Sequence, residues 1–213
     1  MQPLQIAIVP VTPFQQNCSI LWCTATMQGA VIDPGGDIAR IRAAVAETGI
    51  TIEKILLTHG HVDHAAAAAE LAESLEVGIE GPHQDDQFLI DGLPAMAEQY
   101  GFPEARAFTP DRYLSDGETV KVGDLTLDVL QVPGHTPGHV VFVHAPSRVA
   151  IVGDTLFQGS VGRTDFPYGS HDQLISGIVE KLLPLGDNMV CLPGHGAVTS
   201  IGDERARNPF LPR

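Results

Sequence analysis

The chain has 213 residues, 44% of them hydrophobic, and 26 Asp and Glu against 12 Lys and Arg give a formal net charge of −14. This content excludes wholesale disorder, and the length leads us to expect a single domain over residues 1–213. The acidic balance argues against a nucleic-acid partner. No stretch approaches the ~20 apolar residues of a membrane span, and the first residues lack a signal-peptide pattern, so we expect no membrane partner and a cytoplasmic location.

The first third of the chain is predicted to alternate short strands with helices. Four apolar runs predict strands: Leu4–Val9, Ser19–Cys23, Ala30–Ile32 and Lys54–Leu57. The third of these ends at the turn Asp33-Pro34-Gly35-Gly36. Asp37–Thr48 predicts a helix by its apolar side, and the Ala-rich run from Ala65 to Glu76 predicts another by its intrinsic propensity.

The remaining segments continue the mixed pattern. Pro82 to Pro110 is predicted to form one or two short helices with Pro breaks, and Gln173–Leu183 a further helix. The other apolar runs predict strands: Glu118–Val122, Leu125–Val132, Val140–Val143, Val149–Val152 and Met189–Leu192. Gly123-Asp124 between the first two is a hairpin signal. Such a mixture of strands and helices predicts an α/β domain with covered sheets.

The three cysteines are predicted to be structural. Cys18, Cys23 and Cys191 form no Cys-x-x-Cys pair, and their number is odd. Cys18 and Cys23 are five positions apart on a predicted strand, which places them on opposite faces. We interpret all three as small buried apolar residues.

Four candidate metal ligands fall within six positions of the segment Thr58–His64, where a strand is expected to give way to a helix: His59, His61, Asp63 and His64. The first three alternate, so an extended loop would turn them to one side, whereas His64 is out of phase and suits a second metal. Asp63 has an alternative as the N-cap of the Ala-rich helix. That alternative leaves the three neighbouring histidines unexplained.

Three more candidates follow, each at the end of a predicted strand and each next to a glycine: His135, Asp154 and His195. Five histidines and two aspartates suit zinc, iron or manganese. A purely structural zinc prefers a Cys-rich closed site, so we expect a functional metal. His139 is expected to be packed or hydrogen-bonded, and solvated side chains are expected for His83, His144 and His171.

The ordered motifs T-H-G-H-V-D-H, G-H-T-P-G-H, G-D-T and P-G-H-G resemble those of the metallo-β-lactamase superfamily over essentially the whole chain. The resemblance implies an αββα sandwich of two mixed β-sheets flanked by helices, with two divalent metal ions at one edge. It places His59, His61 and His135 on the first metal, and Asp63, His64 and His195 on the second. Asp154 would bridge the metals, and Asp33 would support the histidine loop.

Metals ~3.5–4 Å apart bring the pKa of a bound water close to 7, so hydroxide would be available at neutral pH. It would attack a carbonyl carbon while a metal accepts the developing negative charge. Asp63 would receive the proton and help deliver it to the leaving group. The expected reaction class is metal-assisted hydrolysis, with Asp63 and Asp154 as catalytic residues.

Further motifs resemble short glyoxalase II-like hydrolases: G-L-P around Leu93, T-P-D-R with Asp111, V-G-R-T-D-F with Arg163, and N-P-F-L with Pro209. This resemblance implies cleavage of the thioester S-D-lactoylglutathione to D-lactate and glutathione. Arg163 would contact the glutathione part, or alternatively pair with Asp165. The chain ends 18 residues after His195, so the C-terminal helical domain of long glyoxalase II proteins is not expected.

The alternative is a persulfide dioxygenase of the same superfamily. Those enzymes share the G-R-T-D-F stretch and a tail like Glu204 to Pro209, and use a single iron held by residues matching His59, His135 and Asp154. The last histidine motif favours the hydrolase, because it reads P-G-H-G where the dioxygenases tend to have Ala before and Asp after the histidine.

Overall fold

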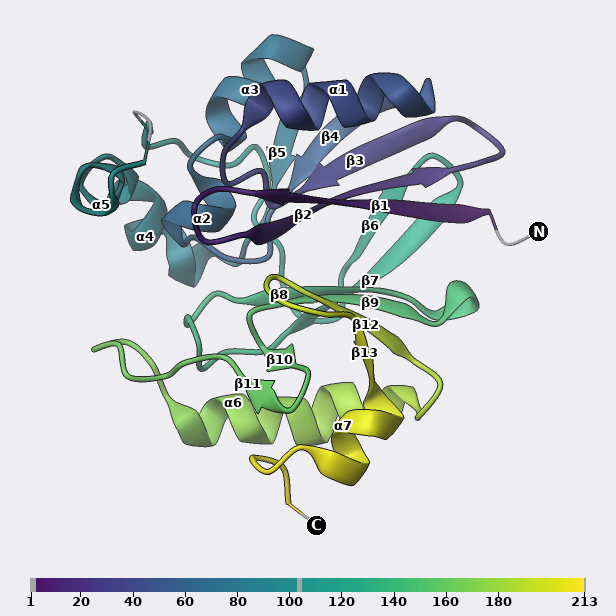
Figure 1. The fold of residues 1–213 in the computed structure, drawn as a ribbon, viewed down its shortest axis with the longest axis vertical. Coiled ribbons are helices and arrows are strands. Elements are labelled where there is room, and N and C mark those ends of the chain that lie inside the picture. The colour runs from purple at the N-terminus through teal and green to yellow at the C-terminus, as the bar shows by residue number, and fades with distance from the viewer. Residues whose placement is uncertain (1–2, 103–104, 213) are drawn as a thin grey trace.

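Two β-sheets face each other in the middle of the molecule, and helices cover the outer side of each (Figure 1). This computed structural model describes residues 3–102 and 105–212. Within those ranges, none of the helices combines the length and the apolar character needed to cross a bilayer.

The first sheet has five strands in the order β1-β2-β3-β4-β5: β1 (Leu4–Val11), β2 (Gln16–Cys23), β3 (Gln28–Ile32), β4 (Thr51–Leu56) and β5 (Gly78–Glu80). The first three strands pair antiparallel, whereas β3, β4 and β5 pair parallel, so the sheet is mixed. Helices α1 (Ile38–Thr48) and α3 (Ala68–Leu75) are the crossovers between the parallel strands and lie on its outer side (Figure 1).

The second sheet has the order β13-β12-β9-β8-β7-β6: β6 (Thr119–Val122), β7 (Leu125–Gln131), β8 (Val140–His144), β9 (Val149–Gly153), β12 (Val190–Pro193) and β13 (Thr199–Ser200). Its strands pair antiparallel except for the parallel pair β9 and β12. Its outer side is covered by a continuous helical run and a last helix: α6 (His171–Gly177), the π-helical turn η3 (Ile178–Leu182), the 3₁₀ turn η4 (Leu183–Leu185) and α7 (Ile201–Arg207).

The remaining elements are short and lie beside or between the two sheets: α2 (Val62–Ala65), η1 (Gln84–Asp86), α4 (Gln87–Asp91), α5 (Leu93–Tyr100), η2 (Ala145–Ser147), β10 (Leu156–Phe157) and β11 (Ser160–Val161). Strands β10 and β11 form a separate two-stranded hairpin. Helices α2, α4 and α5 gather at one end of the first sheet (Figure 1).

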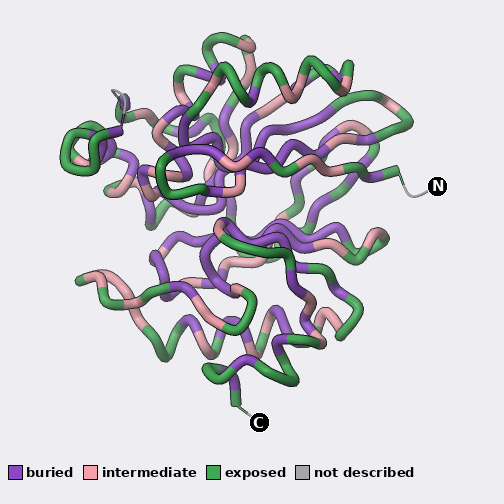
Figure 2. The backbone as a smooth tube through the Cα atoms, viewed as in Figure 1, coloured by how far each residue is buried: buried purple, intermediate pink, exposed green. Residues whose placement is uncertain are grey.

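Three apolar clusters correspond to the three interfaces of this layered arrangement. One joins the first sheet to α1 and α3, and another joins the second sheet to α6, η3 and α7. The third lies between the sheets and contains Leu21 and Ile32 of the first sheet with Val129 and Phe142 of the second. Burial is accordingly concentrated in the sheets and on the inward sides of the helices (Figure 2). The αββα sandwich that the motifs imply is therefore confirmed.

The cysteines confirm the predicted alternation along β2. Cys18 packs in the cluster under the helices, whereas Cys23 packs in the cluster between the sheets. All three cysteines are buried and free, as expected. Each of the three lies within an apolar cluster, and Cys191 of β12 packs in the cluster under α6 and η3.

Parallel pairing gathers the functional segments at one edge. Because β3 and β4 run parallel, Asp33 and the segment 58–64 follow their carboxyl ends on the same side. The parallel pair β9 and β12 does the same for Asp154 and His195 in the second sheet. His135 follows the carboxyl end of β7. All the predicted ligands therefore reach one end of the sandwich.

Candidate metal centre

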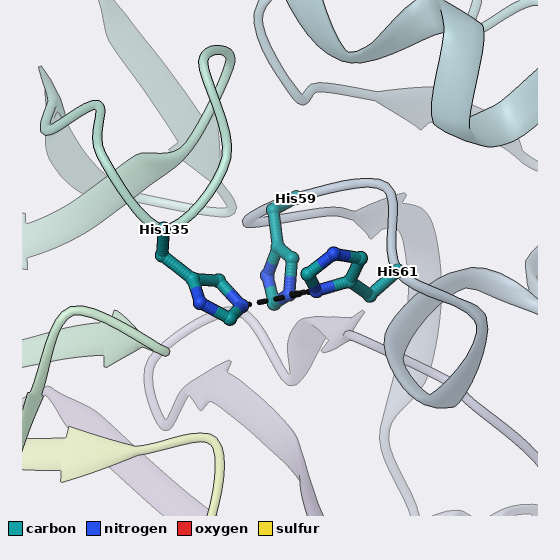
Figure 3. Close-up of side chains that lie close together, drawn as sticks. All are labelled: His59, His61 and His135. Atoms are coloured by element: carbon teal, nitrogen blue, oxygen red, sulfur yellow. Dashed lines mark hydrogen bonds between the residues drawn. The ribbon is translucent and has the colours of Figure 1, made fainter. Parts of the chain in front are cut away.

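Three histidine side chains converge at the first of two adjoining groups of ligands. The Nε2 atoms of His59 and His135 lie 3.1 and 3.0 Å from Nδ1 of His61, and the three rings point toward one another (Figure 3). His59 and His61 come from the loop after β4, and His135 from the loop between β7 and β8. A tetrahedral zinc with Zn–N bonds of ~2.0–2.1 Å holds its nitrogens about 3.3 Å apart, so this spacing fits a metal ion.

Asp63, His64 and His195 form the second group, with ligand atoms within 4.8 Å of one another. Asp63 and His64 lie on α2, and His195 follows β12. The Nε2 atom of His195 is 3.0 Å from Oδ2 of Asp63, and that of His64 is 3.8 Å from the same oxygen. This set of one carboxylate and two imidazoles suits a divalent transition metal.

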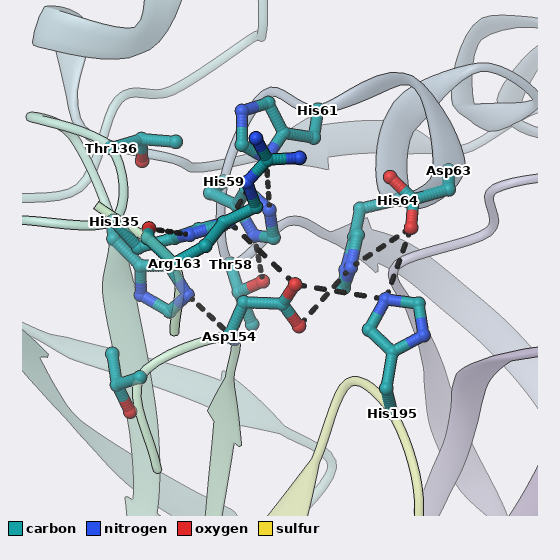
Figure 4. Close-up of polar contacts among 12 residues, drawn as sticks. Thr58, His59, His61, Asp63, His64, His135, Thr136, Asp154, Arg163 and His195 are labelled. Atoms are coloured by element: carbon teal, nitrogen blue, oxygen red, sulfur yellow. Dashed lines mark hydrogen bonds and ion pairs between the residues drawn. The ribbon is translucent and has the colours of Figure 1, made fainter. Parts of the chain in front are cut away.

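Asp154 stands between the two groups (Figure 4). Its Oδ1 lies 3.4 Å from His64 Nε2, and its Oδ2 lies 3.6 Å from Nε2 of both His135 and His195. Among the described residues, His64 Nε2 and Asp154 Oδ1 are buried side-chain atoms that make no hydrogen bond. Buried polar atoms without such partners are costly, and a metal ion shared by these residues would satisfy both.

In each site histidine, the ring nitrogen that faces away from the centre has a hydrogen-bond partner. Side chains supply three of these partners: Thr58 Oγ1 for His59 (3.0 Å), Tyr168 Oη for His61 (2.9 Å) and Asp33 Oδ2 for His64 (2.9 Å). Main-chain carbonyls supply the other two: that of Arg163 for His135 (2.8 Å) and that of Phe14 for His195 (3.2 Å). An imidazole that donates its outer N–H to such an acceptor turns the lone pair of its other nitrogen inward. All five rings are thereby oriented with their other nitrogen toward the centre.

Asp33 connects the two groups from behind. Its Oδ2 accepts hydrogen bonds from Thr58 Oγ1 and from His64 Nδ1, and its Oδ1 accepts one from the Thr58 main-chain N–H. Because the Thr58 hydroxyl donates to Asp33, its oxygen is free to accept the Nδ1–H of His59. Asp33 therefore orients a histidine of each group.

Burial makes the histidines of the first group neutral. Burial and the neighbouring His135 lower the pKa of His61 to about 3. Burial also lowers the pKa of His59 and of His135. Neutral imidazoles are the form that binds metals, so no proton has to leave these three rings at pH 7.

The second group and Asp154 carry the charge of the site. Burial raises the pKa of Asp154, but His64, His135 and His195 outweigh this effect and hold it well below its usual range. For His64 the two effects have the opposite signs. Burial lowers its pKa, but the neighbouring Asp154 and Asp63 raise it by more, so the pKa of His64 lies well above its usual value. The carboxylates are therefore ionised at neutral pH and can face cations.

One geometric expectation about these residues is wrong. Helix α2 begins at Val62, so Asp63 and His64 lie on a helical turn, and Asp63 does not continue the alternation of His59 and His61. The N-cap of α2 is His61, and Asp63 lies in the first turn, which also overturns its alternative role as N-cap. The helical turn brings Asp63 and His64 to a common group because neighbouring positions there do not point to opposite sides.

Two glycines permit the close packing that the site needs. A Cβ at Gly35 would overlap the main-chain carbonyl of Asp63, so the turn after β3 lies directly against α2. A Cβ at Gly194 would overlap the Asp154 carboxylate and the His64 ring. Asn17 holds the second of these loops, since its Nδ2 donates to the carbonyls of Pro193 and Gly196.

Asp86 is a site residue that the sequence analysis missed. Its Oδ2 accepts hydrogen bonds from Gly60 N–H (2.9 Å) and Thr136 Oγ1 (2.7 Å), and its Oδ1 accepts one from Gly138 N–H (2.6 Å). Burial outweighs these bonds and raises its pKa to about 6. The carboxyl group thus ties the loop of His59 and His61 to the loop of His135.

A pocket of about 620 Å³ opens beside the two groups. Its lining includes His61, Asp63, Asp154, Arg163 and Tyr168. The Arg163 guanidinium makes a two-point ion pair with Asp165, at 2.7 and 2.8 Å, and lies 4.3 Å from the centre of the Phe166 ring. The pairing considered as the alternative for Arg163 is therefore present, in a side chain that also reaches the pocket.

The other four histidines lie outside the two groups. His139 is buried and its Nε2 accepts from Asp154 N–H, as expected for a hydrogen-bonded residue. His171 is exposed, and His83 is partly exposed and caps η1. The expectation for His144 is wrong: β8 extends one residue beyond Val143, and this histidine pairs with Val149 and is buried.

Two three-residue ligand groups joined by a carboxylate, at one edge of an αββα sandwich, define a metal-dependent enzyme centre. The model of the metallo-beta-lactamase superfamily matches residues 11–195. The chain therefore belongs to the metallo-β-lactamase superfamily, and its His and Asp clusters form a divalent-metal site.

Individual members of this superfamily are similar to the chain over nearly its full length. The chain is 46% identical to the hydroxyacylglutathione hydrolase GloC of Haemophilus influenzae over 98% of both chains. It is similar to the crystal structure of the B3 metallo-beta-lactamase BLEG-1, with a TM-score of 0.89 and 32% identity over 97% of this chain and 99% of that one. It also resembles TTHA1623 in a di-iron-bound form, with a TM-score of 0.85 and 34% identity over 96% and 100% of the two chains.

Proposed function

We propose that the protein is a binuclear metal-dependent hydrolase that cleaves S-D-lactoylglutathione to D-lactate and glutathione. The observation that carries the proposal is the position of Asp154, within 3.4–3.6 Å of histidines from both ligand groups and beside a pocket. The similarity over nearly the full length of a hydroxyacylglutathione hydrolase supports the choice of substrate.

The proposed ligands divide as the two groups do. His59, His61 and His135 would hold one ion, Asp63, His64 and His195 the other, and Asp154 would lie on both. We propose zinc, and the same nitrogen and oxygen donors also suit iron and manganese. Bound metal ions would supply a water of pKa near 7 and polarise the thioester carbonyl.

The chain's own residues would orient the reactants and move the proton. In the reaction the water oxygen bonds to the acyl carbon, the C–S bond breaks with its electron pair passing to sulfur, and the thiolate takes up a proton. Asp63 lines the pocket and is ionised, so it is placed to receive the proton of the water and return it to the sulfur. The glutathione part of the substrate would extend toward Arg163, which offers two N–H groups to a carboxylate or carbonyl.

We also place the protein in the cytoplasm as a part of this proposal. Its three buried cysteines are all free, which agrees with a reducing compartment.

The test compares two reactions on one preparation. Metal-free protein is reloaded with zinc, iron or manganese, and is assayed for thiol release from S-D-lactoylglutathione and for oxygen uptake with glutathione persulfide. We expect thiol release that is abolished in Asp154→Ala and retained in His171→Ala, a substitution at an exposed histidine. Persulfide-dependent oxygen uptake by a one-iron protein without thiol release would replace this proposal by the dioxygenase.

A further inference from the structure

Several phenylalanine and tyrosine side chains line the pocket. Phe14 and Tyr100 are 45% and 44% exposed, pack edge to face at 5.9 Å between ring centres, and both line the pocket. Leu89 and Met96 from α4 and α5 extend the same wall. Exposed apolar side chains that gather at one place mark a binding surface, and here that surface adjoins the metal centre.

The aromatic residues stand on two sides of the centre. Phe166 lies beside the first ligand group, 5.0 Å from the His61 ring centre, and stacks on Tyr168. Phe157 lies beside the second group, 6.4 Å from the His195 ring centre. The main-chain carbonyl of Phe14 accepts the Nδ1–H of His195, so residue Phe14 also adjoins the second group, and its ring packs on Tyr100.

Charge distinguishes these two sides. Among the described residues that line the pocket, Arg163 is the one Lys or Arg side chain, and it stacks on Phe166. The anionic glutathione part of a substrate would therefore extend to the Phe166 side. The acyl carbon has to lie at the metal centre, and its substituent then faces Phe14 and Phe157, where an apolar group is favoured because it leaves water.

We propose, on the basis of the proposed function, that the preferred substrate is a glutathione thioester whose 2-hydroxyacyl group carries an aromatic ring, and that this ring packs against Phe14 and Phe157. A lactoyl group places only a methyl at this wall and leaves it in contact with water. The side chains of Phe14 and Phe157 thus set acyl specificity, whereas the main-chain carbonyl of Phe14 holds the His195 ring.

The experiment compares S-D-mandeloylglutathione with S-D-lactoylglutathione on the metal-loaded protein. One methylene in an apolar pocket already changes kcat/KM by about tenfold or more, so we expect kcat/KM for the mandeloyl substrate to be at least about tenfold higher. Phe157→Ala and Phe14→Ala should each remove most of this advantage, so that the ratio of the two kcat/KM values falls toward one. Phe210→Ala, an exposed phenylalanine outside the pocket lining, is the matched control.

Binding of the products D-mandelate and D-lactate, measured by calorimetry, should show the same preference and the same loss in Phe157→Ala. Equal or lower kcat/KM for the mandeloyl substrate would overturn the acyl-pocket inference and leave the thioesterase function standing. Equal losses on both substrates in the Phe14 and Phe157 variants would also overturn it. Failure to cleave either thioester would instead refute the proposed function itself.

Discussion

The hydroxyl of Tyr168 holds His61 from a position on the pocket wall. Of the five site histidines, His61 depends on a tyrosine for its outer nitrogen, at 2.9 Å, and Phe166 stacks on that ring at 5.2 Å between centres. The fixed phenol keeps the Nε2 of His61 protonated and its Nδ1 directed at the other two rings. Under the proposed function, Tyr168 is therefore a positioning residue for the ion that His59, His61 and His135 would hold.

Tyr168→Phe is expected to weaken metal binding without unfolding the protein. Loss of a supporting hydrogen bond to a ligand histidine typically lowers metal affinity by about 10- to 100-fold. Competition with a chromophoric chelator measures this directly. The control is Tyr113→Phe, which removes a hydroxyl bonded to Gln87 away from the site. Equal affinities in the two variants would show that Tyr168 does not position His61.

Arg163 offers a test of how the thiol part of the substrate is bound. Its contact would be remote from the C–S bond and similar in ground and transition states, so Arg163→Ala should raise KM far more than it lowers kcat. A charge-assisted contact corresponds to about ten- to a hundred-fold in kcat/KM. A small thioester without glutathione should be affected much less, and Arg207→Ala serves as the surface control.

Metal content should be unchanged in Arg163→Ala, since only the main-chain carbonyl of this residue touches a ligand. A collapse of kcat, or equal losses on both substrates, would mean that the side chain supports the metal loop. Unchanged kinetics on both substrates would leave it as a partner of Asp165 alone.

The sequence indicates the residues that the structure brings together in the two groups more readily than the residues that support them. His59 to His64 lie in one short motif, and the glycine-flanked residues His135, Asp154 and His195 are recognisable locally. Asp86 and Tyr168 carry no such signal, because they act on residues 26 to 107 positions away in the chain. Only the folded backbone brings them to the site.

Among the elements, the segment of η1 and α4 has a role beyond covering the first sheet. Asp86 lies where η1 passes into α4 and accepts three hydrogen bonds from the two histidine loops, and Leu89 of α4 lines the pocket. This segment thus connects the pocket wall to both ligand loops of the first group.

Asp86→Ala should lower the free energy of unfolding and should also loosen the ligand group of His59, His61 and His135. Each buried donor left without a partner costs ~1–3 kcal/mol, so we expect a loss of about 2–4 kcal/mol in the free energy of unfolding. Urea unfolding of the metal-free protein measures it, and Glu98→Gln on the exposed side of α5 is the control. A loss below about 0.5 kcal/mol in the free energy of unfolding would mean that Asp86 does not hold the two histidine loops together.

Long, strongly patterned elements were predictable from sequence and short ones were not. The hairpin of β6 and β7 and helix α1 match their predicted ranges within one residue. The Ala-rich run is predicted as one helix, but the structure divides this region into α2 and α3. Intrinsic helix propensity depends on the local residues only, and it cannot show where the ligand loop requires a break. Three-residue β5 and helix α7 were missed because their pairing and packing partners are distant in sequence.

The cluster between the sheets leads us to propose that residues 1–213 unfold as a single domain. The cluster combines residues of both sheets, so neither half retains its full core without the other. Trp22, the one tryptophan, lies on β2 of the first sheet, whereas Phe142 lies on β8 of the second and is fully buried.

Phe142→Ala should therefore shift the unfolding of both sheets equally. A buried Phe→Ala substitution costs ~3–5 kcal/mol. We expect the fluorescence transition of Trp22 and the far-ultraviolet circular dichroism transition to move together to lower denaturant. A Trp22 transition that stays in place while circular dichroism shifts would mean two independently folding halves.

We propose that Asp154 joins two metal ions that act together, and metal titration of the metal-free protein measures whether it does. Thioester hydrolysis is followed as zinc is added, with bound metal measured by elemental analysis at each point. We predict two equivalents per chain in the active protein and loss of both bound metal and turnover in Asp154→Ala. Full activity at one equivalent, or two retained metals with a near-normal rate in Asp154→Ala, would contradict the claim.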